Sequence, residues 1–391
     1  MERKNKLVFL SNYFNHHQRF LADEFYRLLG DGYTFIETMP MEEERKSLGW
    51  NREERPYLFS SYGSDEAYRE ALDRINSADV VIWGSAPDKM VRGRIKAGKL
   101  TFRYSERVYK KEPPRYEMPL RALKYYFRFG RYKNVHLLCA SAYTAGDYAR
   151  TRTFVGKAYK WGYFTEVKKY EDPLALIATK KPRSILWVAR FLTLKRPEAP
   201  IEVARRLRKE GYQFELNMIG VGEELERARG LVEQLGLADC VHLLGSMKPE
   251  EVRAYMERSE IFLFTSDRRE GWGAVLNESM NSGCAVVASH AIGAAPFLIK
   301  DGENGELYCD GDTDALYQKV KTLLDCPERR ERLGKNAYET MAFKWSPQVA
   351  AERFAILAAE LLEGAPTSTY DDGPCSIAPR LRDNWYMSQG E

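Results

Sequence analysis

Two short apolar runs in the second half of the chain bracket a polar segment, and this arrangement restricts the possible folds more than any other feature. Ile261–Phe264 and Ala285–Ala288 have the length and composition of buried strands. A polar loop follows the first run, and a helical stretch then ends at Gly283. A strand, a helix and a second strand in this order form a βαβ unit, which requires a parallel sheet.

The loop of this unit has a composition that suits an anionic ligand. Gly271, Trp272 and Gly273 stand where we expect the helix to begin, and the free N–H groups at a helix start attract phosphate. Glu270 precedes this start and Glu278 lies about two turns further, roughly 10–12 Å along the axis at ~1.5 Å per residue. Two carboxylates beside an anion cradle fit a nucleotide diphosphate-sugar. A capped helix with two surface glutamates explains the same spacing without a ligand.

Similar apolar runs alternate with amphipathic helices along the rest of the chain. The other expected strands are Leu7–Leu10, Tyr33–Ile36, Ala78–Trp83, Leu100–Tyr104, Val135–Ala140, Ser184–Ala189, Phe214–Ile219, Val241–Leu244 and Glu306–Cys309. The expected helices include 65–77, 198–210, 223–235, 249–258 and 346–363. This alternation predicts an α/β fold with parallel sheets, and a length of 391 residues predicts two domains. We expect residues 165–182 to be a connector and the segment from Ala365 onward to be loop or partly disordered.

The composition indicates a soluble protein of the cytoplasm. Charged residues make up 30% of the chain and hydrophobic ones 44%, and no run approaches the ~18 apolar residues that span a bilayer. The apolar run at residues 7–10 is too short for a signal peptide. The six cysteines are scattered without a C-x-x-C pair, so neither a zinc site nor a redox motif is indicated.

The segment 102–133 is rich in basic and aromatic residues. It holds ten basic residues against three acidic ones, interleaved with nine tyrosines and phenylalanines. Such a helix fits an interfacial surface on anionic lipid. It fits equally a helix whose aromatic side chains are core and whose cations are solvated. Nucleic acid is the weaker third alternative, and we expect no nucleic-acid partner.

Several short motifs occur in order across residues 184–345. They are Ala189–Lys195, Gly220–Glu223, Leu244–Ser246, Glu270–Gly273 with Glu278, and Ile299–Gly305. Together they resemble the GT-B glycosyltransferases of the retaining family numbered 4, the group 1 glycosyl transferases. Ala189 stands where that family has glycine, and the opening loop of the first domain lacks the usual paired glycines.

The resemblance implies an α/β architecture of two Rossmann-like domains facing across a cleft, the GT-B fold. An acceptor-binding domain would cover residues 1–168 and a nucleotide-sugar-binding domain residues 169–345. A C-terminal helix crossing back, with the tail, would cover residues 346–391.

The resemblance also implies roles for individual residues. Arg190 and Lys195 would neutralise the leaving diphosphate, Glu270 would hold the donor sugar hydroxyls and Glu278 the ribose hydroxyls. The other implied donor-binding residues are Gly220, Gly222, Ser246, Met247, Gly271, Trp272 and Gly273. The acceptor hydroxyl would attack on the face from which the diphosphate leaves, and a phosphate oxygen would take its proton. We expect no cofactor and no metal, because Asp310-Gly311-Asp312 fits a turn and a helix N-cap.

In the first domain we expect three side chains to face the acceptor. His16 and His17 follow the first strand, and Glu106 ends the strand where related enzymes place a histidine. The implied function is retaining transfer of a sugar from a nucleotide-diphosphate sugar, uridine-linked, to a hydroxyl of a glycan or lipid-linked acceptor. It would serve surface polysaccharide or glycolipid synthesis at the inner face of the cell membrane. A nucleotide-sugar epimerase on the same fold and a non-catalytic sugar or nucleotide binder are the alternatives.

Overall fold

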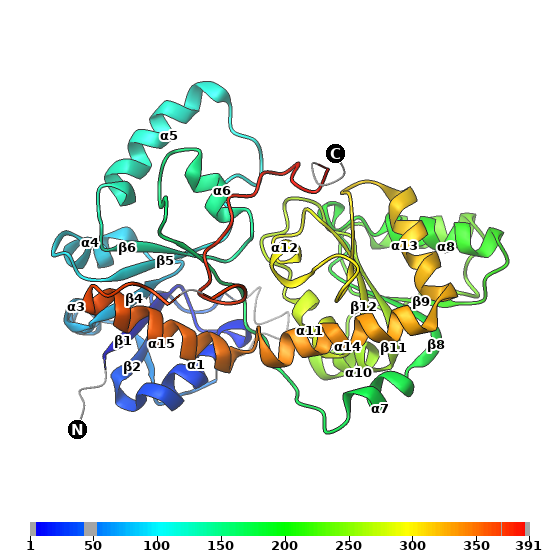
Figure 1. Cartoon of the computed structure of the whole chain (residues 1–391), viewed down its shortest axis with the longest axis horizontal. Coiled ribbons are helices and arrows are strands. Elements are labelled where there is room, and N and C mark those ends of the chain that lie inside the picture. Colours follow the sequence, from blue (N-terminus) through cyan, green and yellow to red (C-terminus); the bar gives the residue numbers. More distant parts are fainter. Residues whose placement is uncertain (1–4, 43–52, 369, 388–391) are drawn as a thin grey trace. The chain divides into compact units, whose positions relative to one another are not determined.

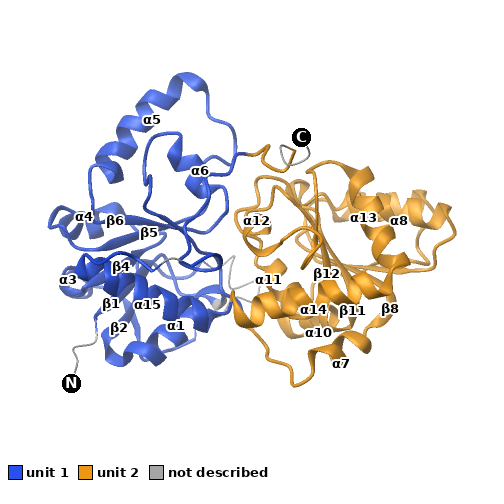
Figure 2. Ribbon diagram, viewed as in Figure 1, with its two compact units in different colours: residues 1–165, 346–382 blue, residues 166–345, 383–391 orange. Residues whose placement is uncertain are grey.

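The computed structural model describes residues 5–42, 53–368 and 370–387, and its contacts divide the chain into two compact units. Unit 1 comprises residues 1–165 and 346–382, and unit 2 comprises residues 166–345 and 383–391 (Figure 2). Each unit contains one parallel sheet with helices packed against it, which confirms the expected α/β class. In the described part of the chain, no helix is both long and apolar enough to cross a membrane.

The sheet of unit 1 has the strand order β3-β2-β1-β4-β5-β6-β7, and every neighbouring pair is parallel. The strands are β1 Leu7–Ser11, β2 Tyr33–Glu37, β3 Leu58–Ser60, β4 Val80–Trp83, β5 Thr101–Ser105, β6 Val135–Cys139 and β7 Ala158–Lys160. The central strands are buried because helices cover the sheet, so they appear in the sequence as continuous apolar runs. The two edge strands β3 and β7 were not predicted.

The helices of unit 1 connect these strands, and one further helix arrives from the C-terminal part of the chain. They are α1 His16–Leu29, α3 Asp65–Ser77, α4 Asp88–Lys96, α5 Met118–Tyr125, α6 Thr144–Ala149 and α15 Pro347–Glu363, with short turns at Gly30–Gly32, Arg115–Glu117 and Tyr126–Gly130. α15 lies beside α1 (Figure 1), where Phe354 packs on Phe25 with ring centroids 5.5 Å apart. The predicted helices at 65–77 and 346–363 are confirmed to within a residue.

The sheet of unit 2 has the order β10-β9-β8-β11-β12-β13, again parallel throughout. Its strands are β8 Lys181–Val188, β9 Glu215–Ile219, β10 Val241–Leu243, β11 Ser259–Phe264, β12 Ala285–Ser289 and β13 Glu306–Tyr308. Its helices are α7 Pro173–Ala178, α8 Glu198–Lys209, α9 Leu225–Gln234, α10 Pro249–Arg258, α11 Val275–Asn281, α12 Ala295–Leu298, α13 Thr313–Asp325 and α14 Pro327–Phe343, with a short turn at Thr193–Lys195. The predicted connector is therefore only partly irregular, because α7 and the start of β8 lie within it.

The C-terminal tail makes specific contacts with the rest of the chain. In unit 1, residues 375–378 run antiparallel beside β7, through a bridge between Tyr159 and Ile377. Residues 383–387 pack on unit 2, where Tyr386 stacks on His290 with ring centroids 5.3 Å apart. The described part of the tail is loop, as expected, and a few aromatic side chains and backbone hydrogen bonds hold it in place.

Candidate functional site

Two loops of unit 2 are held together at the carboxyl edge of its sheet, where parallel α/β sheets bind ligands. They follow the adjacent strands β8 and β11. The backbone N–H of Asp267 donates to Leu194 O at 2.9 Å. The Thr265 hydroxyl donates to Lys195 O at 2.7 Å and accepts from the Trp187 indole at 2.9 Å. The loop after β8 carries Arg190 and Lys195, the two cations predicted to neutralise the diphosphate. It is therefore hydrogen-bonded to the loop that carries Glu270.

Lys195 and Glu270 form an ion pair between these two loops. Both side chains are largely buried, with 15% and 14% of their surface exposed, so the pair is shielded from water. The Lys195 ammonium also lies 5.9 Å from the centroid of the Phe264 ring. Two residues predicted separately as catalytic are thus direct partners in this structure.

Arg190 lies just after β8 and has an exposed side chain. Among the residues that the structure describes, no carboxylate pairs with its guanidinium. The charge of Arg190 is therefore available at the sheet edge, whereas that of Lys195 is neutralised by Glu270. This contrast was not visible in the sequence, where both residues were expected to act on phosphate in the same way.

Gly220 and Gly222 follow β9, and both positions require glycine because another backbone segment packs closely against them. Their φ angles are +141° and +154°, and a Cβ atom would lie 1.9 Å from Ala189 O at Gly220 and 2.3 Å from Phe191 O at Gly222. The neighbouring backbone at both positions is the loop that carries Arg190.

Ser246 and Met247 lie in the loop after β10, beside this glycine pair. The N–H of Gly220 donates to Gly245 O at 2.8 Å, which brings the loop after β10 against the loop after β9. Ser246 is exposed and Met247 is partly exposed. The predicted donor residues thus lie at the ends of the neighbouring strands β10, β9, β8 and β11.

The helix after β11 begins later than predicted. α11 starts at Val275, so the expected helix start at Gly271–Gly273 is wrong. Gly273 has φ +92°, outside the helical region, and a Cβ there would lie 2.5 Å from the Phe264 ring. Glu278 therefore lies in the first turn of α11 rather than two turns in. A helix of seven residues also has a smaller dipole than the prediction assumed.

Trp272 is a core residue. Its ring is 1% exposed and packs near Trp345 and Phe297, with centroids 6.2 Å and 6.4 Å away. The indole N–H donates to Asn277 Oδ1 at 3.0 Å. The ring therefore faces the interior, and the expected donor-binding role of Trp272 stays a prediction for its backbone. Its backbone lies in the loop between Glu270 and α11.

Glu278 combines burial with a carboxylate that has no protein partner among the described residues. The side chains that donate to this residue reach its carbonyl oxygen, from Arg253 at 3.2 Å and from the Ser282 hydroxyl at 2.8 Å. Burial raises the pKa of the Glu278 carboxyl above its ordinary value, and the positive charge of Arg253 partly opposes this shift. A partly buried carboxylate with free acceptor capacity suits a ligand that brings hydroxyl donors.

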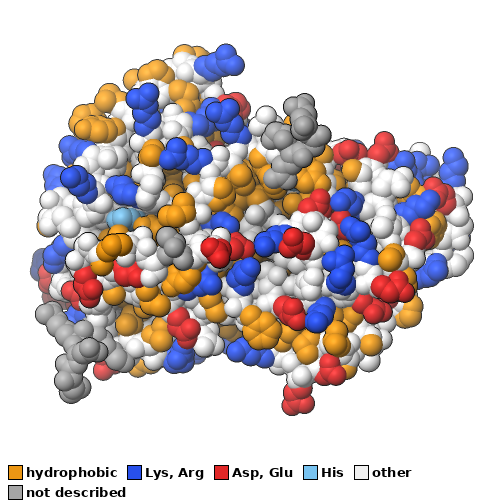
Figure 3. Space-filling model, in the orientation of Figure 1, with side chains coloured by type: hydrophobic (Ala, Val, Ile, Leu, Met, Phe, Trp, Pro, Cys, Tyr) orange, Lys and Arg blue, Asp and Glu red, His pale blue; other side chains and the backbone are white. Residues whose placement is uncertain are grey.

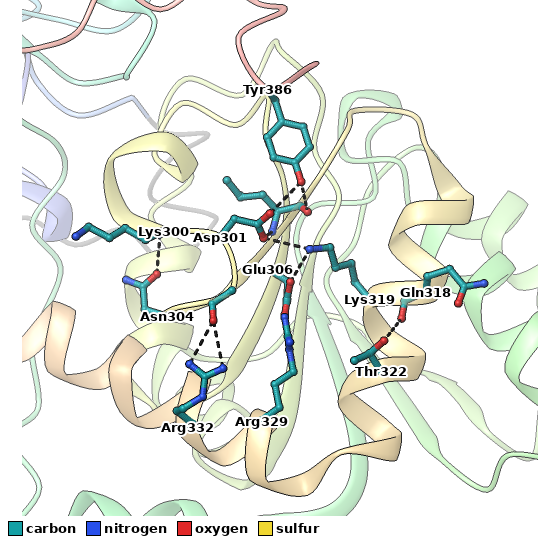
Figure 4. Close-up of polar contacts among 12 residues, drawn as sticks. Lys300, Asp301, Asn304, Glu306, Gln318, Lys319, Thr322, Arg329, Arg332 and Tyr386 are labelled. Carbon is teal, nitrogen blue, oxygen red and sulfur yellow. Dashed lines mark hydrogen bonds and ion pairs between the residues drawn. The ribbon is translucent and has the colours of Figure 1, made fainter. Parts of the chain in front are cut away.

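Polar residues of the Ile299–Gly305 motif are engaged within the protein (Figure 4). Asn304 accepts from the Lys300 N–H at 2.7 Å, and Asp301 accepts from the Leu307 N–H at 2.7 Å. Figure 4 shows Tyr386 reaching the same aspartate, with its hydroxyl 3.1 Å from Asp301 Oδ2. This motif therefore shapes the turn before β13.

The Asp310-Gly311-Asp312 sequence is a turn and a helix cap, as predicted. Asp312 is the N-cap of α13 and accepts from the Ala315 N–H at 2.8 Å. Asp310 pairs with Arg196 at 3.2 Å, and burial raises the pKa of the Asp310 carboxyl. In the described residues, no group of three or more His, Cys, Asp or Glu side chains is arranged to hold a metal ion.

In unit 1, Tyr163 links two of the three residues that were expected to face an acceptor. The Tyr163 hydroxyl donates to Glu106 Oε1 at 2.6 Å, and its ring stacks on His17 with centroids 5.8 Å apart. Glu106 also pairs with Lys110 at 2.9 Å. The sequence reasoning missed Tyr163, which follows the unpredicted strand β7.

His17 lies in the first turn of α1, which begins within the segment predicted as a loop. Asn15 caps this helix by accepting from the His17 N–H at 2.9 Å. His16 begins the helix, and its side chain lies outside the described part of the structure. The structure therefore brings His17 and Glu106 together through Tyr163, whereas the expectation for His16 stays a prediction.

Comparison with known proteins relates this chain to glycosyltransferases. Residues 171–340 match the family model described as glycosyl transferases group 1. The chain is 35% identical over 144 residues to the amylovoran biosynthesis glycosyltransferase AmsK of Erwinia amylovora, covering 36% of this chain and 35% of AmsK. It is 26% identical over 175 residues to the lipopolysaccharide core biosynthesis glycosyltransferase LpsE of Rhizobium meliloti, covering 45% and 49%. The aligned region thus spans less than half the length of either relative.

Solved structures resemble the chain over most of its length. The crystal structure of Anabaena Alr3699/HepE in complex with UDP covers 92% of this chain and all of that one, with a TM-score of 0.67 and 14% sequence identity. At this identity the likeness concerns the fold, which is GT-B. Residues 171–340 of this chain therefore match the family of group 1 glycosyl transferases, within a chain that has the GT-B fold.

Proposed function

We propose that this protein is a retaining glycosyltransferase that uses a uridine diphosphate-sugar and a glycan or lipid-linked acceptor. The observation that carries the proposal is the grouping of an available cation, Arg190, with the Lys195–Glu270 pair and the unpartnered Glu278 carboxylate at one sheet edge. A nucleoside diphosphate-sugar offers two anionic phosphates and two sets of hydroxyls. Cations and carboxylates in one place match both kinds of group.

The Lys195–Glu270 pair is proposed to change partners when donor binds. The ammonium of Lys195 would donate to a phosphate oxygen, and the carboxylate of Glu270 would accept from hydroxyls of the donor sugar. Arg190, already without a carboxylate partner in the described structure, would bind the diphosphate directly. As the bond from the anomeric carbon to the phosphate oxygen breaks, both cations would stabilise the charge that collects on the diphosphate.

The transfer step requires no protein base. The acceptor hydroxyl would form the new bond to the anomeric carbon on the face that the diphosphate leaves, and its proton would pass to the departing phosphate. In unit 1, His17, Tyr163 and Glu106 form the proposed acceptor contact, because they supply a hydroxyl, a carboxylate and aromatic surface together. The names of AmsK and LpsE support an acceptor in surface polysaccharide or lipopolysaccharide synthesis. We place this activity at the cytoplasmic face of the cell membrane.

A thermal-shift screen followed by turnover assays tests the proposal. UDP and UDP-sugars should stabilise the protein, by about 2.7 kcal/mol at a ligand concentration 100 times Kd, and Arg190→Ala should lose most of this effect. Lys209→Ala, an exposed cation on α8, is the matched control. Absence of stabilisation by every nucleotide would contradict the proposed donor class.

Incubation with the stabilising donor separates transfer from the alternatives. A transferase releases UDP faster when the acceptor glycan is added. An epimerase converts the donor sugar without any acceptor, and a non-catalytic binder leaves the donor intact.

A further inference from the structure

Helix α5 and the turn after it present two apolar faces, of which only one packs on unit 1. The inner face contains Tyr125 and Phe129, whose rings lie 5.4 Å and 6.0 Å from that of Tyr148. Phe129 is fully buried and also lies 5.2 Å from the ring of Phe154. This face accounts for the attachment of α5 to the rest of the unit.

The outer face carries a row of exposed apolar side chains. Tyr116, Leu120, Leu123 and Phe127 are 79%, 71%, 55% and 53% exposed. Leu120 and Leu123, three residues apart, lie on one side of α5, and Tyr116 and Phe127 lie in the helical turns that flank it. We call these four residues the α5 stripe. Figure 3 shows hydrophobic and basic side chains side by side over α5.

Positive charge surrounds the α5 stripe. Lys111, Arg115, Lys124 and Lys133 are exposed, and the described structure gives none of them a carboxylate partner. The Arg131 guanidinium lies 5.4 Å from the ring of Phe127.

The acidic residues of this segment are neutralised locally. Glu112 pairs with Arg150 at 2.6 Å, and Glu117 pairs with Arg121 at 2.7 Å. The surface therefore combines an apolar stripe with unopposed cations.

We propose that the α5 stripe and its flanking cations bind the surface of an anionic lipid bilayer. The four apolar side chains would enter the boundary between headgroups and acyl chains, and the cations would lie among the anionic headgroups. The consequence of this inference, that the enzyme reaches a lipid-linked acceptor at a membrane, rests on the proposed function. The inference adds the side chains that make the contact.

The charge distribution disfavours the other occupants of such a face. A second copy of this chain in a two-fold dimer would bring the same cations against themselves. Single-stranded nucleic acid binds through bases stacked on aromatic rings, and the centre of the stripe is Leu120 and Leu123. An anionic bilayer satisfies both the cations and the leucines.

Vesicle flotation tests the inference without any enzymatic assay. The full chain should float with vesicles of phosphatidylcholine and phosphatidylglycerol, and not with phosphatidylcholine alone. A variant with L120S, L123S and F127S should bind the anionic vesicles at least tenfold more weakly. The matched control carries L174S and I356S, two side chains on α7 and α15 that are 55% and 46% exposed. A charge variant, K111Q with K124Q, should lose about fivefold in binding per cation removed.

Three results would overturn the inference. They are wild-type flotation of the stripe variant, a dimer by light scattering that the stripe variant abolishes, and displacement of wild-type protein from vesicles by single-stranded RNA. UDP stabilisation is measured on the same samples and should be unchanged in the stripe variant. If UDP does not stabilise the wild-type protein, only the proposed donor is contradicted. If the wild-type protein does not float with anionic vesicles, only the proposed lipid surface is contradicted.

Discussion

The carboxylate of Asp383, in the C-terminal tail, lies 2.8 Å from the guanidinium of Arg268, two residues before Glu270. The carbonyl of Asp383 accepts from His290 Nε2 at 3.0 Å, because His290 Nδ1 already accepts from the Asp310 N–H. The tail is thereby attached to the loop that carries Glu270 and to the loop after β12.

Asp383→Asn should raise KM for the donor about two- to fivefold, the effect expected for a half-exposed ion pair, with a smaller change in kcat. The reason is that the Glu270 loop would lose one of its fixed contacts. Steady-state kinetics with varied donor measures this split. Asp371→Asn, an exposed tail carboxylate in unit 1, serves as the control and should leave KM unchanged. Equal KM values in both variants would argue against positioning by the tail.

Lys195→Ala and Arg190→Ala should each lower turnover by roughly 10²–10³, because each removes a cation that stabilises the departing diphosphate. Single-turnover rates with saturating donor measure the effect on chemistry. The two variants should differ in the unliganded protein, since only Lys195→Ala leaves Glu270 without its partner. Activity within a few-fold of wild type for both would remove these residues from the catalytic step.

Donor affinity should fall as the pH is lowered, through the Glu278 carboxyl. Burial raises the pKa of this group in the free protein, and hydroxyl donors from a ribose would favour its ionised form. Binding would therefore release a proton, and affinity would weaken as the pH falls through the raised pKa. Calorimetric titration of UDP in buffers of different ionisation enthalpy measures this release. Glu278→Gln should abolish it, whereas Glu233→Gln on α9 should retain it.

Tyr163→Phe should raise KM for the acceptor several-fold while leaving UDP binding unchanged. The substitution removes the hydroxyl that holds Glu106 at 2.6 Å but keeps the ring that stacks on His17. Acceptor kinetics and UDP titration together separate this effect from a loss of folding. Tyr68→Phe, on α3 of the same unit, is the matched control. A parallel loss of UDP binding would contradict a role confined to the acceptor.

Gly220→Ala should destabilise unit 2 by about 1–3 kcal/mol, because a Cβ there would lie 1.9 Å from Ala189 O. Gly230→Ala is the opposite case, since this glycine lies inside α9 with no atom within 4 Å of the added Cβ, and it should stabilise by about 0.5–1 kcal/mol. Urea unfolding followed by tryptophan fluorescence compares the two variants. Equal effects would mean that the contact with Ala189 is not what requires glycine at position 220.

Much of the fold could be predicted from local pattern. Buried parallel strands need continuous apolar runs, and Ile261–Phe264 and Ala285–Ala288 proved to be the cores of β11 and β12. The helix at 249–258 was predicted to the residue, because a proline starts it and the apolar spacing supports it. The three-residue strands β3 and β7 escaped prediction, since pairing with a neighbour rather than their own sequence makes them strands.

The candidate site was predictable as a set of residues but not as a set of contacts. Order along the chain identified Arg190, Lys195, Glu270 and Glu278, because loops after parallel strands gather at one edge of the sheet. Lys195 pairs with Glu270 although the two residues are 75 positions apart in the sequence. This pairing, and the availability of Arg190, depend on where the side chains lie in the folded protein. The burial of the Trp272 ring was not predicted for the same reason, since its core partner Trp345 lies in a distant segment.

The sequence by itself determined the two α/β units, the match of residues 171–340 to the group 1 glycosyl transferases and the residues available for chemistry. It did so because strand and helix periods and motif order are local properties of the chain. Only the tertiary structure decided which charges neutralise each other, that Tyr163 joins His17 to Glu106, that Asp383 holds Arg268, and which face of α5 stays uncovered. These features depend on contacts between segments far apart in the chain, which no local pattern encodes.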